Sequence, residues 1–153
     1  TAAAPRQETL FAEVLKPGRH GDVCQMPGRK GTQATDLARA FFSSSVLSVE
    51  RKILAAVGAG SAKTDAQIAG MNFDVGDAVG PFTVVQRNES EVLFCWSPHM
   101  GGFTWLAVAE GGTTIEFGST IDKEGYPLVH ALLPFHLVYA RICIASAQKK
   151  LQE

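Results

Sequence analysis

The chain has 153 residues, of which 46% are hydrophobic and 19% are charged, so its composition excludes a wholly disordered polypeptide and fits one domain over residues 1–153. Its 14 Lys and Arg oppose 15 Asp and Glu, and the formal net charge of -1 excludes the basic excess typical of general nucleic-acid binders. The cysteines Cys24, Cys95 and Cys143 form no CxxC pair, so we expect no metal, no cofactor and a reducing, cytoplasmic setting in a bacterial-type protein.

Hydropathy along the chain predicts no membrane span. No uninterrupted apolar run approaches the ~20 residues that a spanning helix needs. The most apolar stretch, residues 128–144, carries four interruptions, namely His130, Pro134, His136 and Arg141. Residues 1–9 lack the apolar region of a signal peptide and are expected to be a flexible N-terminus.

The first third of the chain predicts one strand followed by two short helices. Residues 10–15 (LFAEVL) are typical of a strand that ends at Pro17 and Gly18, and residues 16–34 are rich in Gly and Pro and predict a loop. Apolar residues then recur at helical spacing over 35–44 and 46–57, with the break at Ser43–Ser45 and an end at Gly58 and Gly60. A helical turn is expected at 64–69.

From Asp74 the apolar period changes to two, which predicts an antiparallel meander of strands at 73–79, 81–87, 91–96, 103–110 and 113–122. Gly111 and Gly112 supply the positive φ that a tight hairpin requires. This turn places Val108 opposite Ile115 and Leu106 opposite Phe117. Because side chains alternate faces, one face, which we expect to be the inner one, then carries Thr104, Leu106, Val108, Ile115, Phe117, Ser119 and Ile121.

Helical spacing returns near the C-terminus and continues to the end. Its apolar stripe consists of Leu128, Leu132, Phe135, Tyr139, Ile142 and Ala145. Pro134 is expected to kink this helix or to restart it. The order of elements predicts an α+β fold, a curved antiparallel sheet that grips a long C-terminal helix, with two short helices after the first strand.

Three motifs carry a family resemblance. They are the segments 97–103 (SPHMGGF), 133–136 (LPFH) and 41–45 (FFSSS). With the order of elements, they resemble the START-like helix-grip superfamily, and within it the bacterial family called domain of unknown function two-eight-six-seven. Gly101 and Gly102 stand where that family's pattern has an acidic residue. The resemblance implies a cavity between sheet and helix that holds an apolar or amphipathic small molecule.

The candidate ligand-binding residues come from the sheet and from the last helix. Branched and aromatic side chains supply the walls of the expected cavity, and histidines and a tyrosine orient a ligand. The residues are Trp96, His99, Leu106, Val108, Ile115, Phe117, Phe135, His136, Tyr139 and Ile142. For His99 and His136 a local structural role remains the alternative, and we assign no catalytic residue.

Two further motifs can be interpreted either as ligand sites or as ordinary loops. His20, Asp22 and Cys24 alternate, and on an extended segment all three metal-ligand types would face one way, but the Gly- and Pro-rich surroundings favour a loop. Gly28–Thr32 (GRKGT) lacks the spacing of a phosphate-binding loop and is better interpreted as a solvated basic loop.

Three functions remain open. The sequence favours a non-enzymatic protein that binds a small hydrophobic molecule. The second function is a cyclase-, dehydratase- or hydrolase-like enzyme on the same scaffold. The third is a filled-core interaction module, in which an exposed Trp105 on the outer face would mark a partner or homodimer surface.

Overall fold

A seven-stranded antiparallel sheet organises the protein. The computed structural model describes residues 1–3, 8–58, 63–124 and 127–153. The strands lie in the order β1-β2-β7-β6-β5-β4-β3. Their bounds are β1 Ala2–Ala3, β2 Arg19–Pro27, β3 Ala78–Val79, β4 Phe82–Arg87, β5 Glu91–Ser97, β6 Gly102–Ala109 and β7 Thr114–Asp122.

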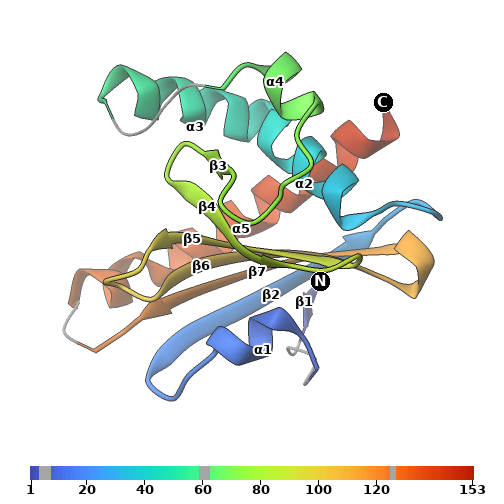
Figure 1. Ribbon diagram of the computed structural model, residues 1–153. Helices are drawn as coiled ribbons and strands as arrows, with labels where there is room; N and C mark the ends of the chain where they lie inside the picture. The colour runs from blue at the N-terminus through green and yellow to red at the C-terminus, as the bar shows by residue number, and fades with distance from the viewer. Residues whose placement is uncertain (4–7, 59–62, 125–126) are drawn as a thin grey trace.

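Helices cover both faces of this sheet (Figure 1). They are α1 Leu10–Val14, α2 Ala34–Ser43, α3 Ser45–Ala56, α4 Asp65–Ala69 and α5 Pro127–Gln152. The short α1 lies on one face, and the other four helices lie on the opposite side, where α5 runs along the sheet. The predicted α+β class, with a curved, unclosed antiparallel sheet and a long C-terminal helix, is confirmed. Helix α5 continues through Pro134.

The main core lies between the sheet and α2 and α5. The predicted hairpin register is confirmed, with Val108 opposite Ile115 and Leu106 opposite Phe117. Leu106, Ile115 and Phe117 pack in one buried cluster with helix residues. The helix residues in that cluster include Leu37, Phe41, Phe42, Ala140, Cys143, Ile144 and Ala147. Between β6 and β7 the chain forms a 3-10 turn, Glu110–Gly112, in which both glycines have positive φ as predicted.

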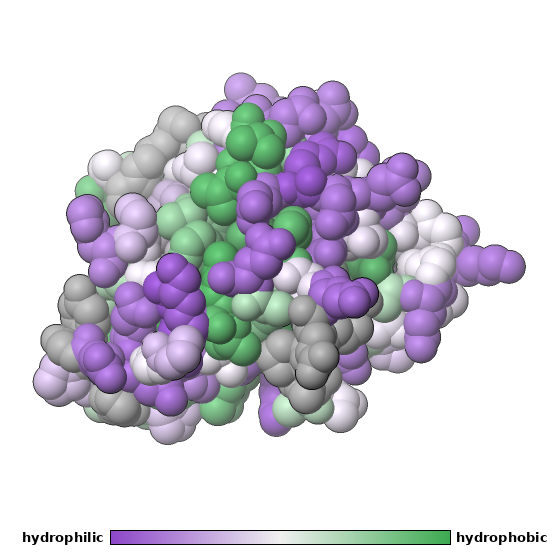
Figure 2. Space-filling view, turned by 60° about the horizontal axis from the view of Figure 1, so that its bottom comes forward, coloured by the Kyte–Doolittle hydropathy of each residue, from purple (hydrophilic) through white to green (hydrophobic). Residues whose placement is uncertain are grey.

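A second, smaller core lies on the α1 face. Phe11 of α1 packs on Leu93 and Trp105 of the sheet, and the rings of Phe11 and Trp105 are 5.3 Å apart. The proposed exposed surface at Trp105 is therefore wrong, because α1 covers that side chain and leaves it 1% exposed. Figure 2, which brings the α1 side of the molecule forward, shows a band of hydrophobic residues between hydrophilic ones.

The predicted strand at 10–15 is wrong, because these residues form α1. The Thr9 side chain accepts a hydrogen bond from the backbone N–H of Ala12 and so caps the helix. Leu10, Val14 and Leu15 pack beside Phe11 in the smaller core, a spacing of three and four residues that suits one helical face. A run of six apolar-rich residues fits the period of a helix as well as that of a strand, and the Thr9 cap favours the helix.

The predicted loop at 16–34 is also wrong over most of its length, because it contains the long strand β2. This strand pairs with β7 along Arg19–Pro27, and Ala2–Ala3 pair with it on the other side. Residues 4–7 of the expected flexible N-terminus lie outside the described residues. Gly21 fits the strand because a Cβ there would meet the Leu15 side chain at 2.2 Å. Glycine here permits close packing and does not mark a loop.

The helices after β2 and the strand before β4 can be compared with their predicted bounds. The helices expected at 35–44 and 46–57 are confirmed as α2 and α3, and the turn at 64–69 is confirmed as α4. Gly58 has positive φ as the expected helix end requires, and Gly60 lies outside the described residues. The strand expected at 73–79 shrinks to Ala78–Val79, because the Asp77 carboxylate accepts the backbone N–H of Asp74 and holds a turn there.

Candidate functional site

A cavity of about 530 Å³ lies between the sheet and the N-terminal half of α5. The sheet contributes residues of β2, β5 and β7 and of the turn after β5, and α5 contributes residues between Leu128 and Tyr139. The lining residues are His20, Trp96, Met100, Ser119, Thr120, Ile121, Leu128, Val129, Leu132, Leu133, Phe135, His136 and Tyr139. Most of this lining is apolar, and its few polar groups come from His20, His136, Trp96, Tyr139 and the β7 hydroxyls.

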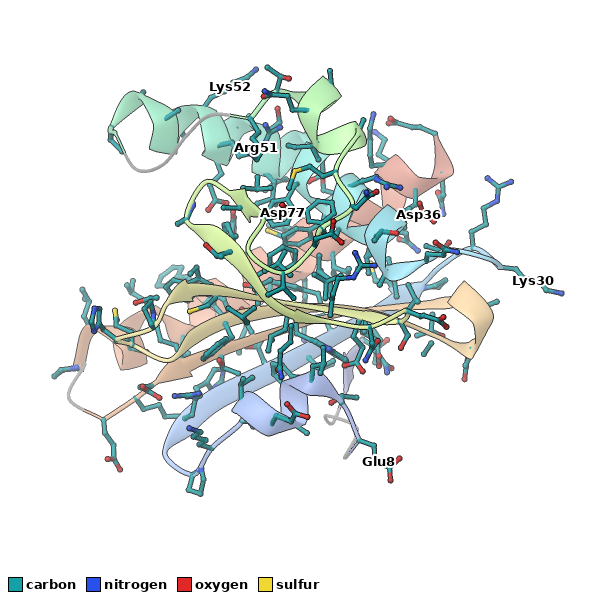
Figure 3. The ribbon with its side chains drawn as sticks, in the orientation of Figure 1. Glu8, Lys30, Asp36, Arg51, Lys52 and Asp77 are labelled. Carbon is teal, nitrogen blue, oxygen red and sulfur yellow. The ribbon has the colours of Figure 1, made fainter. Side chains whose placement is uncertain are left out.

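The cavity is open to solvent along α5. Phe135 is 73% exposed and Leu128 is 69% exposed, although both line the cavity. Exposure of large apolar side chains to water is unfavourable in free energy, so a cavity mouth lined by them favours an apolar occupant. In Figure 3 the labelled charged side chains of Glu8, Lys30 and Lys52 project outward, away from the space between the sheet and the helices. Many unlabelled side chains fill that space.

A second cavity of about 250 Å³ adjoins the first. The two share Trp96, Ser119, His136 and Tyr139 as lining residues. The second is lined in addition by core residues, including Phe41, Phe117 and Cys143. Shared walls mean that a rotation of Tyr139 or His136 changes both volumes together.

His20, Asp22 and His136 meet at the polar side of the larger cavity. His20 and Asp22 share one face of β2 because they are two residues apart, and His136 reaches them from α5. The Oδ1 atom of Asp22 lies 3.3 Å from Nε2 of His20 and 3.6 Å from Nε2 of His136. The side chains of His20 and Asp22 are 18% and 12% exposed, whereas His136 is 33% exposed.

This cluster is short of hydrogen bonds. Both carboxylate oxygens of Asp22 and the Nε2 atom of His20 are buried and have no hydrogen-bond partner among the described residues. A buried polar group without a partner costs about 1–3 kcal/mol by mutational data, and an unpaired charge costs more. Such unpartnered groups in the wall of a cavity make the cluster a candidate functional site.

No described set of three His, Cys, Asp or Glu side chains is placed to hold a metal ion. The alternation of His20, Asp22 and Cys24 is real, because β2 is extended there and these residues face the helices. Cys24, however, lies in the main core, and burial raises the pKa of its thiol, with Asp22 adding to the rise. A raised pKa disfavours the thiolate that would bind a metal.

A second polar group lies between α3 and α5. The Tyr139 hydroxyl donates a hydrogen bond to Oε2 of Glu50. Burial and this carboxylate raise the pKa of Tyr139, and burial raises the pKa of Cys143 to about 12. Both groups therefore stay neutral in the cavity wall at ordinary pH. Tyr139 acts there as a donor to Glu50 and Cys143 as a small apolar side chain.

The structure brings half of the predicted ligand-binding residues to the two cavities. These are Trp96, Phe117, Phe135, His136 and Tyr139. Leu106 and Ile115 face the helices as expected, but they are fully buried under α2 and line neither cavity. Val108 borders a separate polar hollow at the opposite end of the sheet. Ile142 is half exposed on the outer side of α5, and His99 is exposed at the turn between β5 and β6.

Several cavity residues were not among the predicted site residues. His20 was masked by its Gly-rich neighbours, and Met100, Leu128, Leu132 and Leu133 gave no signal that separates a cavity wall from a core. Ser119 was placed on the correct face of β7 by the hairpin register. The alternation of polar residues in His20–Cys24 was the one signal that could have located the polar cluster.

Apolar side chains are also exposed outside the cavity. Val49 and Ile53 of α3, Val57 just after its end and Val138 of α5 are more than half exposed. The stretch Ala131–Gln152 of α5 is long and apolar enough to cross a membrane by length and composition, a criterion that the core helix of a soluble protein also meets, so it does not decide the expectation of no membrane span. The same stretch supplies Ala140, Ile144 and Ala147 to the core.

No protein-family model matches the chain, and searches among curated proteins and among solved structures also found no match.

Proposed function

We propose that the protein binds one small, mostly apolar molecule in the cavity between the sheet and α5, with the polar end of that molecule at His20 and His136. The observation that carries this proposal is the cavity itself. Its volume of about 530 Å³ falls within the ~300–1,000 Å³ that small-molecule sites occupy. Apolar walls with a few convergent polar groups are the usual composition of such sites.

The driving force would be burial of apolar surface. Each Å² of apolar area removed from water is worth about 25 cal/mol before the entropic costs of binding. An occupant would also cover Phe135, Leu128 and Leu132, which otherwise face water. The resemblance to START-like proteins, which implies a ligand between sheet and helix, supports the same interpretation.

The proposal is tested by filling the cavity. Leu133 lines the cavity, and Leu137 lies one helical turn further along α5 outside it. We expect Leu133→Trp to weaken binding of 1-decanol, measured by calorimetry, at least tenfold. Leu137→Trp is the matched control and should bind like the unmodified protein. Equal affinity in the two variants, both folded by circular dichroism, would refute binding in this cavity.

A second candidate is an enzyme of cyclase, dehydratase or hydrolase type on the same scaffold. The His20–Asp22–His136 cluster favours it, because a carboxylate that orients an imidazole is a common arrangement for a general base. Turnover of an aromatic or polyketide-like substrate that is lost in His20→Gln and His136→Gln would support this candidate. Binding without turnover would leave the first proposal.

The third candidate is an interaction module, and it is favoured by the exposed apolar residues of α3 and α5. Its discriminating measurement is mass as a function of concentration. A homodimer that Val49→Ser and Ile53→Ser dissociate would support it, whereas a monomer that takes up 1-decanol would favour the ligand-binding proposal.

A further inference from the structure

We propose that the His20–Asp22–His136 cluster selects ligands whose head group donates a hydrogen bond, an alcohol or a primary amine, over ligands with a carboxylate head group. This inference rests on the proposed function, because it specifies the molecule that the cavity between the sheet and α5 would hold. It starts from three buried atoms that the described protein leaves without hydrogen bonds.

The carboxylate of Asp22 lies beside both imidazoles. An ionised carboxylate only accepts hydrogen bonds, and its Oδ1 lies 3.3 Å from Nε2 of His20 and 3.6 Å from Nε2 of His136 without forming a hydrogen bond to either. A neutral imidazole has one protonated nitrogen and one acceptor nitrogen in either tautomer. Each neutral histidine therefore offers one acceptor to a head group that donates a hydrogen bond.

The ligand meets the histidines and not the carboxylate. His20 and His136 line the cavity, whereas both oxygens of Asp22 are buried behind them. The neighbouring hydroxyl of Thr120 already donates to the carbonyl oxygen of Gly101 at 2.8 Å. A head group that donates a hydrogen bond complements these imidazole acceptors, and a carboxylate cannot do so.

The charges around the two cavities act in the same direction. Asp22 lies behind the histidines, and Glu50 lines the smaller cavity, where it accepts the Tyr139 hydroxyl. None of the described residues that line either cavity is a Lys or an Arg. A carboxylate ligand would meet like charge and no cation in the lining of the two cavities, whereas an ammonium group would be attracted. The nearby cation Arg141, which acts on Cys24, lies outside both linings.

The test compares three probes with the same chain and different head groups. Binding of 1-decanol, decylamine and decanoate to the full chain is measured by calorimetry at pH 8. We expect the alcohol and the amine to bind at least tenfold more tightly than decanoate. If the amine exceeds the alcohol by a further tenfold, the attraction of Asp22 for charge dominates; if the two are equal, hydrogen bonding to the imidazoles does.

The variant Asp22→Asn separates this inference from the proposed function. The amide removes the negative charge beside the two histidines, so the preference over decanoate should fall below threefold. Asp74→Asn, at an exposed aspartate of similar chemistry, should keep the full preference. His136→Phe is the second variant if Asp22→Asn does not fold, and it should also reduce the preference.

The outcomes are distinct. Decanoate binding as tightly as the alcohol, or a full preference retained in both Asp22→Asn and His136→Phe, would overturn the inference while leaving cavity binding intact. Failure of all three probes to bind the folded, unmodified protein would overturn the proposed function and the inference with it.

Discussion

The side chains of Asp22 on β2 and His136 on α5 approach within 3.6 Å, although most of the chain separates them in sequence. Their meeting depends on the sheet order, because β2 lies next to β7 and α5 packs across both. A polar pair at this place closes one side of an otherwise apolar cavity. The protein therefore holds buried carboxylate oxygens without hydrogen-bond partners next to the two histidines that line the cavity.

Asp22→Asn is expected to stabilise the protein. The carboxylate oxygens are buried without hydrogen-bond partners, and the amide removes the charge while keeping the size. We expect the free energy of unfolding at pH 8 to rise by about 1–2 kcal/mol, as is common where a functional site holds an unfavourable group. Urea unfolding measures it, with Asp74→Asn as a control that changes little. A loss of stability would show that Asp22 is structural.

Glu91→Gln is expected to destabilise the protein. One carboxylate oxygen of Glu91 accepts the Trp105 indole N–H at 2.7 Å and the backbone N–H of Leu10 at 2.8 Å. It thereby ties α1 to the sheet. Loss of the charge from these buried hydrogen bonds should lower the free energy of unfolding by about 1.5–3 kcal/mol. The exposed neighbour Glu89→Gln is the control, and equal effects of the two variants would contradict this role.

Gly118→Ala tests the packing of α1 on the sheet. A Cβ at this position would lie 2.8 Å from the Phe11 ring and 2.9 Å from the Trp105 ring, both of which are buried. Overpacking of this kind costs about 1–3 kcal/mol, measured as a shift in the urea midpoint. Gly70→Ala meets only ordinary contacts at 3.7 Å and should leave the midpoint almost unchanged. A tolerated Gly118→Ala would show that α1 can move away from the sheet.

Stability is expected to fall at alkaline pH. Burial raises the pKa of Cys143 from 9.0 to about 12 and also raises that of Tyr139, so the folded protein holds these protons more tightly than the unfolded chain. The contribution of Cys143 is complete below pH 9 and is lost as the pH rises toward 12, at up to about 1.4 kcal/mol per pH unit. Tyr139 adds to the loss above pH 10. Thermal melts from pH 8 to 10.5 measure it. Cys143→Ala should give a shallower decline, and an identical slope would contradict the assignment.

The sequence predicted the elements whose period is long or whose turn is distinctive. The pair Gly111 and Gly112 fixed the register of Val108 against Ile115, and the serine run separated α2 from α3. Residues 10–15 were predicted as a strand and form α1, because a short apolar run fits either period. Residues 16–34 were predicted as a loop and contain β2, because Gly21 in this strand resembles loop sequence. Glycine is needed at position 21 because the Leu15 side chain packs against it, a contact that the local sequence pattern does not reveal.

The site was predictable to a smaller extent for a physical reason. Whether an inward-facing side chain fills a core or borders a cavity depends on what lies opposite it, and α2 covers Leu106 and Ile115 while nothing comparable covers Trp96. That choice is made by tertiary packing. The polar cluster needed three facts together: that β2 is a strand, that it neighbours β7, and that His136 points toward it.

The measurement that tests the central claim most directly is native mass spectrometry of the purified protein before and after addition of 1-decanol. We expect one bound molecule per chain, either co-purified or added. This bound mass should be absent from Leu133→Trp and present in Leu137→Trp. A spectrum that shows only the bare chain at saturating 1-decanol, from protein that is folded, would contradict the account.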